Sequence, residues 1–289
     1  MSDEIESEIV ARPRDLGGFT VGRVLPAIGR RMVGPFTFLD HMGPAELDEM
    51  SVRPHPHINL ATVTYLFEGA IVHRDTLGSH QTISPGAINW MSAGKGIAHS
   101  ERILKDGTIK RMHGLQLWVA LPTAIEETEP FFEHTPASAL PAHPDGGTTL
   151  RVLCGKAFGV TSPVRTVSPL FYVDVQLQPG ATIALPEGYA ERAAYIVDGA
   201  VTIGASRLPA RHMAVFGTGA SPMLVADGPT RLVLLGGEPL DGPRYIWWNF
   251  VSSSKQRIEA MAEKWRSGTW AKIPGDAIEF TPAPDGPRF

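Results

Sequence analysis

Short apolar segments that end at a glycine or a proline are the feature that most limits how this chain can fold. The 289 residues include 30 glycines and 25 prolines, a share well above the ~12% usual in globular proteins. Strand-like segments such as 62–67, 87–91 and 115–121 follow one another closely, with turn residues between them. Strands at this spacing predict an all-β fold, either a sandwich or a barrel.

An internal repeat indicates that the chain contains two similar β-domains. Residues 65–70 (YLFEGA) match residues 195–200 (YIVDGA), and both read as a strand that ends in a glycine turn. The proline- and glycine-rich stretch 122–150 has the composition of a linker. The sequence therefore predicts a tail at 1–17, a first domain at 18–140 and a second at 141–289.

One helix is predicted within the second domain, over residues 253–267. Ser253 and Gln256 have the spacing of a capping box, and Gly268 is suited to end the helix. The apolar residues of this segment recur at the helical period and predict a face that packs against one barrel: Ile258, Met261, Ala262 and Trp265.

Charge and composition exclude several classes of function. A net charge of −4 and a pI near 6.2, without a basic run, argue against nucleic-acid binding. No apolar stretch approaches the ~18 residues of a membrane span, and residues 1–10 lack the features of a signal peptide. Cys154 is the only cysteine, so it predicts a small buried residue in a reducing compartment. We expect a cytoplasmic protein.

Two pairs of side chains predict a metal site in the first domain. His55 and His57 are two residues apart, as are His99 and Glu101, the spacing that puts two side chains on one face of a strand. A single such pair is weak evidence, because a buried histidine is more often a hydrogen-bonded core residue. Two pairs on neighbouring strands would bring three imidazoles and one carboxylate together.

The predicted ligands narrow the choice of metal and favour a catalytic site over a structural one. Imidazole suits zinc, copper, iron and nickel, carboxylate suits harder ions, and no thiolate is present to favour a structural zinc site. Four protein ligands on an ion that prefers six leave two positions free. In the repeat, the positions that correspond to His55 and His57 are Leu185 and Glu187, so only the first domain is expected to bind metal.

Several motifs in residues 18–122 resemble those of the pirin family. They are residues 34–44 (GPFTFLDHMGP), His55-Pro56-His57 before the segment 62–66, and residues 89–101 (NWMSAGKGIAHSE), followed by residues 114–119. The motif 237–240 resembles the C-terminal domain of the family. Residues 58–61 (INLA) depart from the family pattern, which usually has an arginine and a glutamate close to this position.

The resemblance implies a bicupin, two cupin-type β-barrels of the double-stranded β-helix kind with a C-terminal helix. It implies one divalent metal held by His55, His57, His99 and Glu101, with iron(II) as the first choice and manganese, nickel, copper and zinc as alternatives. Some bacterial members are similar in activity to quercetin 2,3-dioxygenase, which opens a flavonol ring with O₂ and releases carbon monoxide. Eukaryotic members are associated with transcription-factor complexes.

Two classes of function follow from this resemblance. The first is a dioxygenase that acts on a flavonol-like aromatic substrate, with Glu101 either as the general base or as a ligand that only balances charge. The second is a non-enzymatic, redox-sensing module that binds a partner protein. The departure at residues 58–61 also leaves another cupin activity open. The oligomeric state is not predicted.

Five polar residues are candidates to orient the ligands: Asp40, His41, His73, Asp75 and Gln116. We rank His41 and Gln116 first. Four aromatic residues are candidates for the wall of a pocket, although core packing is the safer default for them: Phe36, Phe38, Trp90 and Trp118.

Overall fold

The computed structural model describes residues 4–16, 19–46, 51–104 and 111–286 of an all-β chain with one α-helix. The chain divides into two compact units, each made of separate segments. Unit 1 contains Met1–Arg14, Gly22–His41 and Thr135–Pro239, and unit 2 contains Asp15–Val21, Met42–His134 and Leu240–Phe289. In the described residues no helix is long and apolar enough to cross a membrane.

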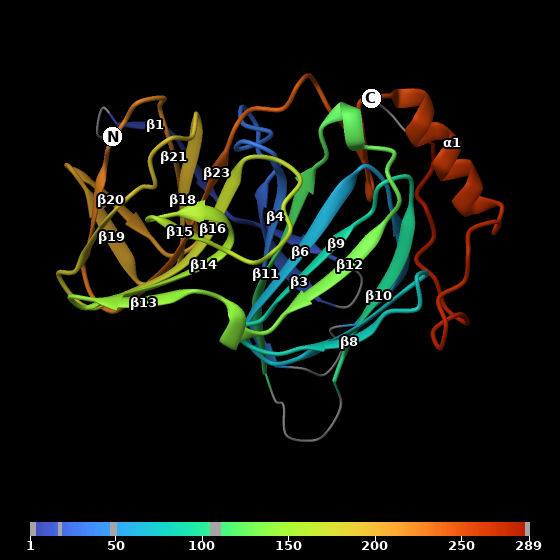
Figure 1. Cartoon of the computed structure of the whole chain (residues 1–289), viewed down its shortest axis with the longest axis horizontal. Coiled ribbons are helices and arrows are strands. Elements are labelled where there is room, and N and C mark those ends of the chain that lie inside the picture. Colours follow the sequence, from blue (N-terminus) through green and yellow to red (C-terminus); the bar gives the residue numbers. More distant parts are fainter. Residues whose placement is uncertain (1–3, 17–18, 47–50, 105–110, 287–289) are drawn as a thin grey trace. The chain divides into compact units, whose positions relative to one another are not determined.

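Unit 2 contains two main antiparallel sheets (Figure 1) and a separate strand pair, β24 (Tyr245–Trp247) with β25 (Phe250–Ser252). The smaller has the order β5 (Val52–His57), β10 (Ile97–Ile103), β7 (Ile71–Asp75), β8 (His80–Ile83). The larger has the order β12 (Phe131–Thr135), β9 (Ile88–Ser92), β6 (Leu60–Glu68), β11 (Arg111–Ala120). It continues through β4 (Phe36–Glu46), β3 (Thr20–Leu25) and β2 (Arg12–Asp15), and the boundary between the units falls within β2, β3, β4 and β12.

Unit 1 repeats this plan. Its smaller sheet has the order β17 (Thr182–Ala184), β22 (Met223–Ala226), β19 (Ala200–Ile203), β20 (Ser206–Pro209). Its larger sheet has the order β1 (Ile5–Val10), β21 (His212–Phe216), β18 (Glu191–Asp198), β23 (Thr230–Gly237), β16 (Leu170–Leu177), β14 (Thr148–Ala157), β13 (Ala142–Asp145), with β15 (Val160–Thr161) paired to β14.

The two smaller sheets have the same order when their strands are counted along the chain: first, fourth, second, third. The strand orders β9-β6-β11-β4 and β21-β18-β23-β16 correspond in the same way. Tyr65 lies on β6 and Tyr195 on β18, so the predicted repeat falls on equivalent strands. Gly69 and Gly199 follow these strands with φ of 89° and 80°, a conformation that favours glycine.

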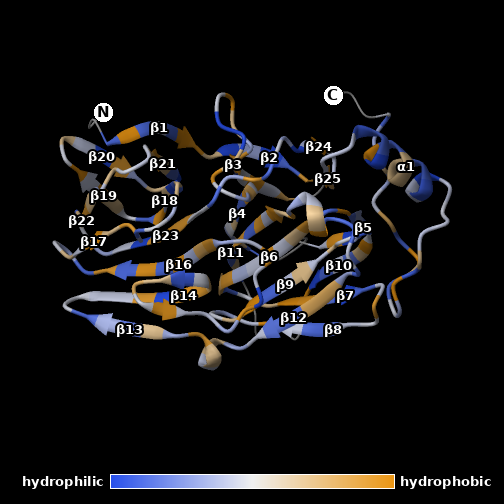
Figure 2. Ribbon diagram, turned by 45° about the horizontal axis from the view of Figure 1, so that its top comes forward, coloured by the Kyte–Doolittle hydropathy of each residue, from blue (hydrophilic) through white to orange (hydrophobic). Residues whose placement is uncertain are grey.

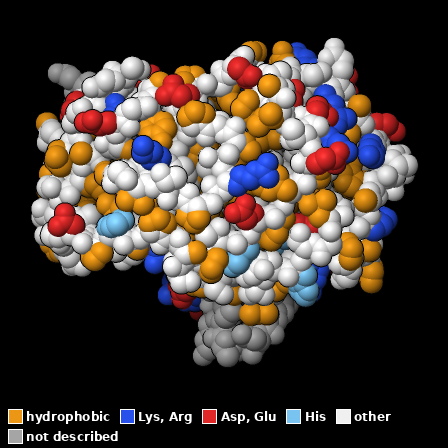
Figure 3. All heavy atoms as spheres, viewed as in Figure 1, with side chains coloured by type: hydrophobic (Ala, Val, Ile, Leu, Met, Phe, Trp, Pro, Cys, Tyr) orange, Lys and Arg blue, Asp and Glu red, His pale blue; other side chains and the backbone are white. Residues whose placement is uncertain are grey.

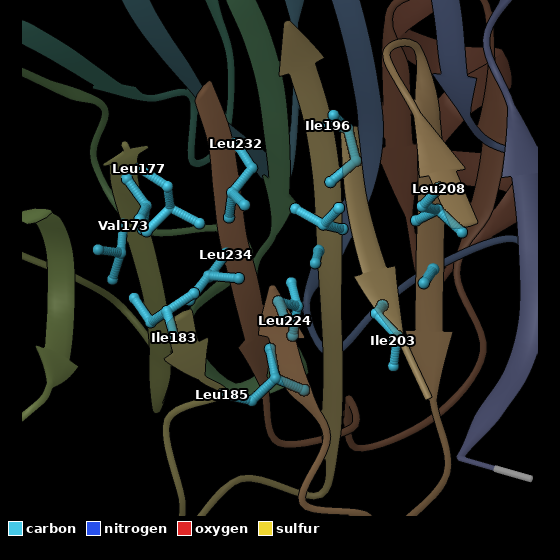
Figure 4. Close-up of a cluster of buried hydrophobic side chains, with 14 of the residues drawn as sticks. Val173, Leu177, Ile183, Leu185, Ile196, Ile203, Leu208, Leu224, Leu232 and Leu234 are labelled. Atoms are coloured by element: carbon cyan, nitrogen blue, oxygen red, sulfur yellow. The ribbon is translucent and has the colours of Figure 1, made fainter. Parts of the chain in front are cut away.

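The interior of unit 1 is apolar where unit 2 has its histidines. Ile183 and Leu185 at β17, and Leu224 and Ala226 on β22, belong to one buried cluster with the central strands (Figure 4). These two pairs have the i, i+2 spacing and occupy the strands that correspond to β5 and β10. The internal repeat in the sequence aligns His57 with Glu187, but Glu187 is exposed. The buried pair at β17 is instead Ile183 and Leu185.

The segments of the chain combine differently from the predicted domains. Residues 240–289 belong to unit 2, although the prediction places them in the second domain. Part of the predicted tail forms β1 and β2, while residues 1–3 and 17 lie outside the described part. Ile5 and Ile9 are 6% exposed and β1 pairs with β21. The two isoleucines are four residues apart, so they share one face of the strand.

The predicted helix is α1 (Lys255–Arg266), and its buried residues are the four predicted ones. Figure 2 shows hydrophobic and hydrophilic residues side by side on this helix, as its amphipathic pattern requires. Its N-cap is Ser254, whose Oγ accepts a hydrogen bond from Arg257 N. The predicted cap, Ser253, instead donates to Glu126. The apolar face packs with Ile58 and Ala98 in one buried cluster.

Candidate metal centre

The predicted metal ligands lie on two paired strands of unit 2. In the antiparallel pairing of β10 with β5, His99 is directly opposite His55 and Ile97 is opposite His57. The strand period places His55 and His57 on one face of β5 and His99 on the same side of β10. Local strand geometry therefore brings the three imidazoles together.

The three histidines form a compact buried cluster. Their candidate ligand atoms all lie within 4.8 Å of one another, and His57 Nε2 is 3.1 Å from His99 Nε2. The rings of His55 and His99 are 4.4 Å apart between centroids. His55 is 7% exposed, and His57 and His99 are each 1% exposed, so water solvates them poorly.

Backbone carbonyl groups orient two of the three rings. His55 Nδ1 donates to Arg53 O at 2.9 Å, and His57 Nδ1 donates to Asn249 O at 2.9 Å. A neutral imidazole that carries its proton on Nδ1 has a lone pair on Nε2. The two bonds therefore leave both Nε2 atoms free to bind a metal.

The third ring contacts side chains instead. His99 Nδ1 is 3.4 Å from His73 Nδ1, and His73 Nε2 is 2.9 Å from Asp75 Oδ2. His73 and Asp75 are among the five predicted orienting residues, although we rank two others above them. Their own i, i+2 spacing on β7 is the signal in the sequence that would have favoured them.

Burial keeps the three rings neutral, which is the form that binds a metal. Desolvation lowers the pKa of His55 to about 4, and it lowers the pKa of His57 and His99 well below the ordinary value of 6.5. Positive charge on a neighbouring histidine lowers all three pKa values further. At neutral pH each of the three rings is therefore neutral and has one ring nitrogen without a proton.

Glu101 lies at the edge of the cluster. Its carboxylate is outside the group of three whose atoms meet within 4.8 Å, and its Oε1 accepts a hydrogen bond from Thr64 Oγ1 at 3.2 Å. A register irregularity separates His99 from Glu101 in the pairing with β5. Burial raises the pKa of Glu101, while charge on His73 and the bond from Thr64 lower it. The residue as a whole is partly exposed.

The two highest-ranked orienting residues have different environments. Gln116 on β11 is directly opposite Thr64 on β6, so its side chain shares a face with the residue that binds Glu101. Its Oε1 is buried without a hydrogen-bond partner among the described residues. His41 belongs to unit 1, where its Nδ1 is 2.7 Å from Tyr195 Oη. Asp40, also in unit 1, binds Arg23 through both carboxylate oxygens.

Aromatic rings flank the cluster in unit 2. Trp118 contacts His57 edge-on with centroids 5.2 Å apart, and Phe132 stacks on His73 at 4.2 Å with 13° between the planes. Trp118 is one of the four predicted wall residues. Trp90 is a buried core residue, and Phe36 and Phe38 belong to unit 1.

A surface pocket of unit 2 lies behind the metal centre. It is lined by Pro54, Ala98 and residues of the C-terminal segment, including Trp265 and Trp270. Pro54 and Ala98 alternate with His55 and His99, so they point to the opposite face of the strands. This pocket therefore does not open onto the histidines.

The histidine cluster fits a first-row divalent metal. The Nε2 atoms of His57 and His99 are 3.1 Å apart. When both present lone pairs they repel one another, and burial strengthens that repulsion. A cation between them removes it. Bonds of ~2.1 Å at right angles place two donors ~3.0 Å apart, close to the observed separation. Three imidazoles with an adjacent carboxylate suit iron, manganese, nickel, copper or zinc.

Comparison with known proteins covers both halves of the chain. The Pirin family model matches residues 18–119, and the model for the Pirin C-terminal cupin domain matches residues 172–271. A pirin-like protein of Caulobacter vibrioides is 52% identical over 285 residues, covering 95% of this chain and 98% of that protein.

Solved structures support the same fold. The crystal structure of a quercetin 2,3-dioxygenase from Acinetobacter baumannii superposes with a TM-score of 0.91 at 34% identity, covering 97% of this chain and 95% of that one. A bacterial pirin of Escherichia coli in complex with nickel(II) superposes with a TM-score of 0.65 at 18% identity, covering 81% and 99%. The second likeness is evidence for the fold alone.

Proposed function

The chain belongs to the pirin family, and from this membership we propose that it is a metal-dependent dioxygenase that opens a flavonol such as quercetin with O₂ and releases carbon monoxide. The observation that carries the proposal is the cluster of His55, His57 and His99, whose Nε2 atoms converge in a buried site. The likeness to the Acinetobacter enzyme supports the choice of substrate.

The metal would be held by His55, His57, His99 and Glu101, with iron(II) as our first choice. When bound, it supplies a Lewis acid for the hydroxyl and carbonyl oxygens of the flavonol and an electron source for O₂. O₂ is the oxidant in the overall reaction, and one ring carbon leaves as carbon monoxide. The buried Cys154 supports a reducing compartment, so we propose that the reaction occurs in the cytoplasm.

Glu101 is the proposed general base. Glu101 is two residues from His99 on β10, and its carboxylate would accept the proton of the flavonol hydroxyl. Thr64 holds one carboxylate oxygen, so the other would bind the metal and, when it is released from the metal, accept the substrate proton.

The surrounding residues would orient the substrate and limit the access of water. Gln116 presents an unpaired side-chain oxygen on the same face as Thr64, so it can accept a hydrogen bond from a phenolic hydroxyl. Trp118 covers one side of His57, and Phe132 covers His73. These rings exclude water from the ligands and strengthen the electrostatic interactions there.

Anaerobic binding followed by oxygen tests this function. Quercetin is added to the iron-loaded protein without O₂, O₂ is then admitted, and carbon monoxide and the ring-opened product are measured. We expect carbon monoxide in equal amount to the quercetin consumed, and none from His57→Ala, which lacks one ligand. Tight iron binding without turnover of quercetin or related catechols would contradict the proposal and favour the non-enzymatic binding module.

A further inference from the structure

We propose that Asp75 and His73 are positioning residues that hold the proton of His99 on Nδ1 and so keep its Nε2 available to a metal. The inference rests on the metal-binding part of the proposed function and does not depend on the substrate. It concerns two residues that the proposed reaction leaves without a role. They occupy the strand on the other side of β10 from β5.

Strand register sets the placement of the pair. In the antiparallel pairing of β10 with β7, Asp75 is opposite His99 and His73 is opposite Glu101. These residues form a block of four polar side chains on one face of two strands. Asp75 is 0% exposed and His73 is 3% exposed, so neither is a surface residue that happens to lie near the site.

The hydrogen bonds define a direction for the protons. The Oδ2 atom of an ionised Asp75 can only accept, so His73 carries its proton on Nε2. His73 Nδ1 then presents a lone pair to His99 Nδ1, 3.4 Å away. His99 completes this contact only if its own proton is on Nδ1, which leaves a lone pair on Nε2.

The Asp75 carboxylate is itself fixed by hydrogen bonds, so it can determine which nitrogens of His73 and His99 carry the protons. Its Oδ1 accepts from Leu77 N at 2.9 Å and from Ser79 N at 3.0 Å, which are backbone groups of the following turn. The stack of Phe132 on the His73 ring restricts the orientation of that ring. The two backbone hydrogen bonds therefore fix the orientation of the Asp75 carboxylate, and the stacking fixes the plane of the His73 ring.

His99 differs from the other two ligands in how it is oriented. His55 and His57 donate to backbone carbonyls, which no substitution of a side chain removes. His99 has a histidine as its neighbour, and a histidine can accept or donate at Nδ1. The competing arrangement places the His99 proton on Nε2 towards His57 and would block the site. The charge on Asp75 disfavours it.

The first experiment determines the tautomers in the metal-free protein. Long-range ¹H–¹⁵N NMR on labelled protein distinguishes a protonated ring nitrogen from an unprotonated one. We expect the proton of His73 on Nε2 and the proton of His99 on Nδ1. A His99 proton on Nε2 in the wild-type protein would overturn the inference.

The second experiment inverts the chain of hydrogen bonds. Asp75→Asn keeps an oxygen for Leu77 and Ser79 but presents an N–H group to His73, so the proton of His99 moves to Nε2. Cobalt(II) affinity, measured by competition with a chelator and by the visible spectrum, should fall about 10–100-fold, the range typical of lost ligand-orienting groups. Asp227→Asn changes an aspartate of unit 1 in the same way and should leave the affinity unchanged.

Two substitutions of His73 keep the inference testable if Asp75→Asn does not fold. His73→Gln retains an oxygen that can accept from His99, whereas His73→Leu retains none. We expect the leucine variant to lose about 10–100-fold in cobalt affinity and the glutamine variant to recover most of it. Equal affinities in both variants and the wild type would overturn the inference. Normal cobalt binding without quercetin turnover would contradict only the proposed reaction.

Discussion

The Nδ1 atom of His57 lies 2.9 Å from the carbonyl oxygen of Asn249, a residue 192 positions further along the chain. Asn249 lies in the turn between β24 (Tyr245–Trp247) and β25 (Phe250–Ser252), within unit 2. The C-terminal segment therefore supplies the group that orients a ligand on β5. Its aromatic residues pack around this turn, with Phe250 fully buried.

Glu101→Gln should separate chemistry from metal binding. If Glu101 is the general base, the amide cannot accept the hydroxyl proton, and kcat should fall about 10²–10⁴-fold. Iron content should fall less than in His57→Ala, because the amide oxygen can still bind the metal, and the KM for quercetin should change little. Glu68→Gln, at the exposed end of β6, is the matched control. A parallel loss of iron would show instead that Glu101 acts mainly as a ligand.

Phe250→Ala should destabilise unit 2 and weaken metal binding together. Phe250 is fully buried, and Trp270 stacks on it at 6.2 Å with 10° between the planes. Removal of a buried phenylalanine side chain typically costs about 3–5 kcal/mol. Urea unfolding and cobalt titration measure the two effects. Phe280→Ala, at a side chain that is 56% exposed, should cost much less, and an equal cost would argue against a core role for Phe250.

Leu224→Ala should destabilise unit 1 without affecting the metal centre. Leu224 is 0% exposed in the apolar interior of that unit, and a buried leucine truncated to alanine costs about 2–5 kcal/mol. The neighbouring Met223 on the same strand is 49% exposed, so Met223→Ala should have little effect. Cobalt affinity of the folded Leu224→Ala protein should equal that of the wild type. A changed affinity would mean that the two units are coupled.

The ion pair between Arg102 and Asp276 predicts a dependence of stability on pH. Both guanidinium contacts to the Asp276 carboxylate are 2.9 Å, and the hydrogen bond from Arg102 lowers the pKa of Asp276 below its ordinary value of 3.8. Because the folded pKa is the lower one, the stabilisation is present above pH 3.8 and is lost as the pH falls through the folded pKa.

Thermal unfolding across this pH range tests the ion pair. Asp276→Asn should lower the Tm at pH 7, and the difference from the wild type should shrink below pH 3.8. Asp145→Asn, at an exposed position of β13, is the control. A difference that stays constant down to pH 2.5 would show that the charge on Asp276 does not contribute. At high salt the difference at pH 7 should also decrease, because the pair is partly exposed.

Charge on the viewed surface is mixed. Figure 3 shows acidic and basic side chains interspersed with hydrophobic ones on this face. The net charge of −4 is therefore not concentrated there.

Several features could be read from the sequence because their causes are local. The i, i+2 spacing of His55 with His57 follows from the two-residue period of a strand, so the pattern alone predicted which imidazoles face one point. The repeat at Tyr65 and Tyr195 predicted two similar domains, because similar short sequences favour the same local strand and turn. The helix was also predicted with its buried face, and its cap differs by one residue because Ser253 bonds with the distant Glu126.

Only the tertiary structure decided what surrounds the three imidazoles. The return of residues 240–289 to unit 2, the carbonyl of Asn249 behind His57 and the pair His73–Asp75 beside His99 all depend on contacts between separate segments. A strand pattern states which face a side chain occupies, but it does not state which strand is the neighbour. That choice is made by non-local packing and sheet register, since burial of apolar faces and pairing of backbone groups are satisfied across the whole fold.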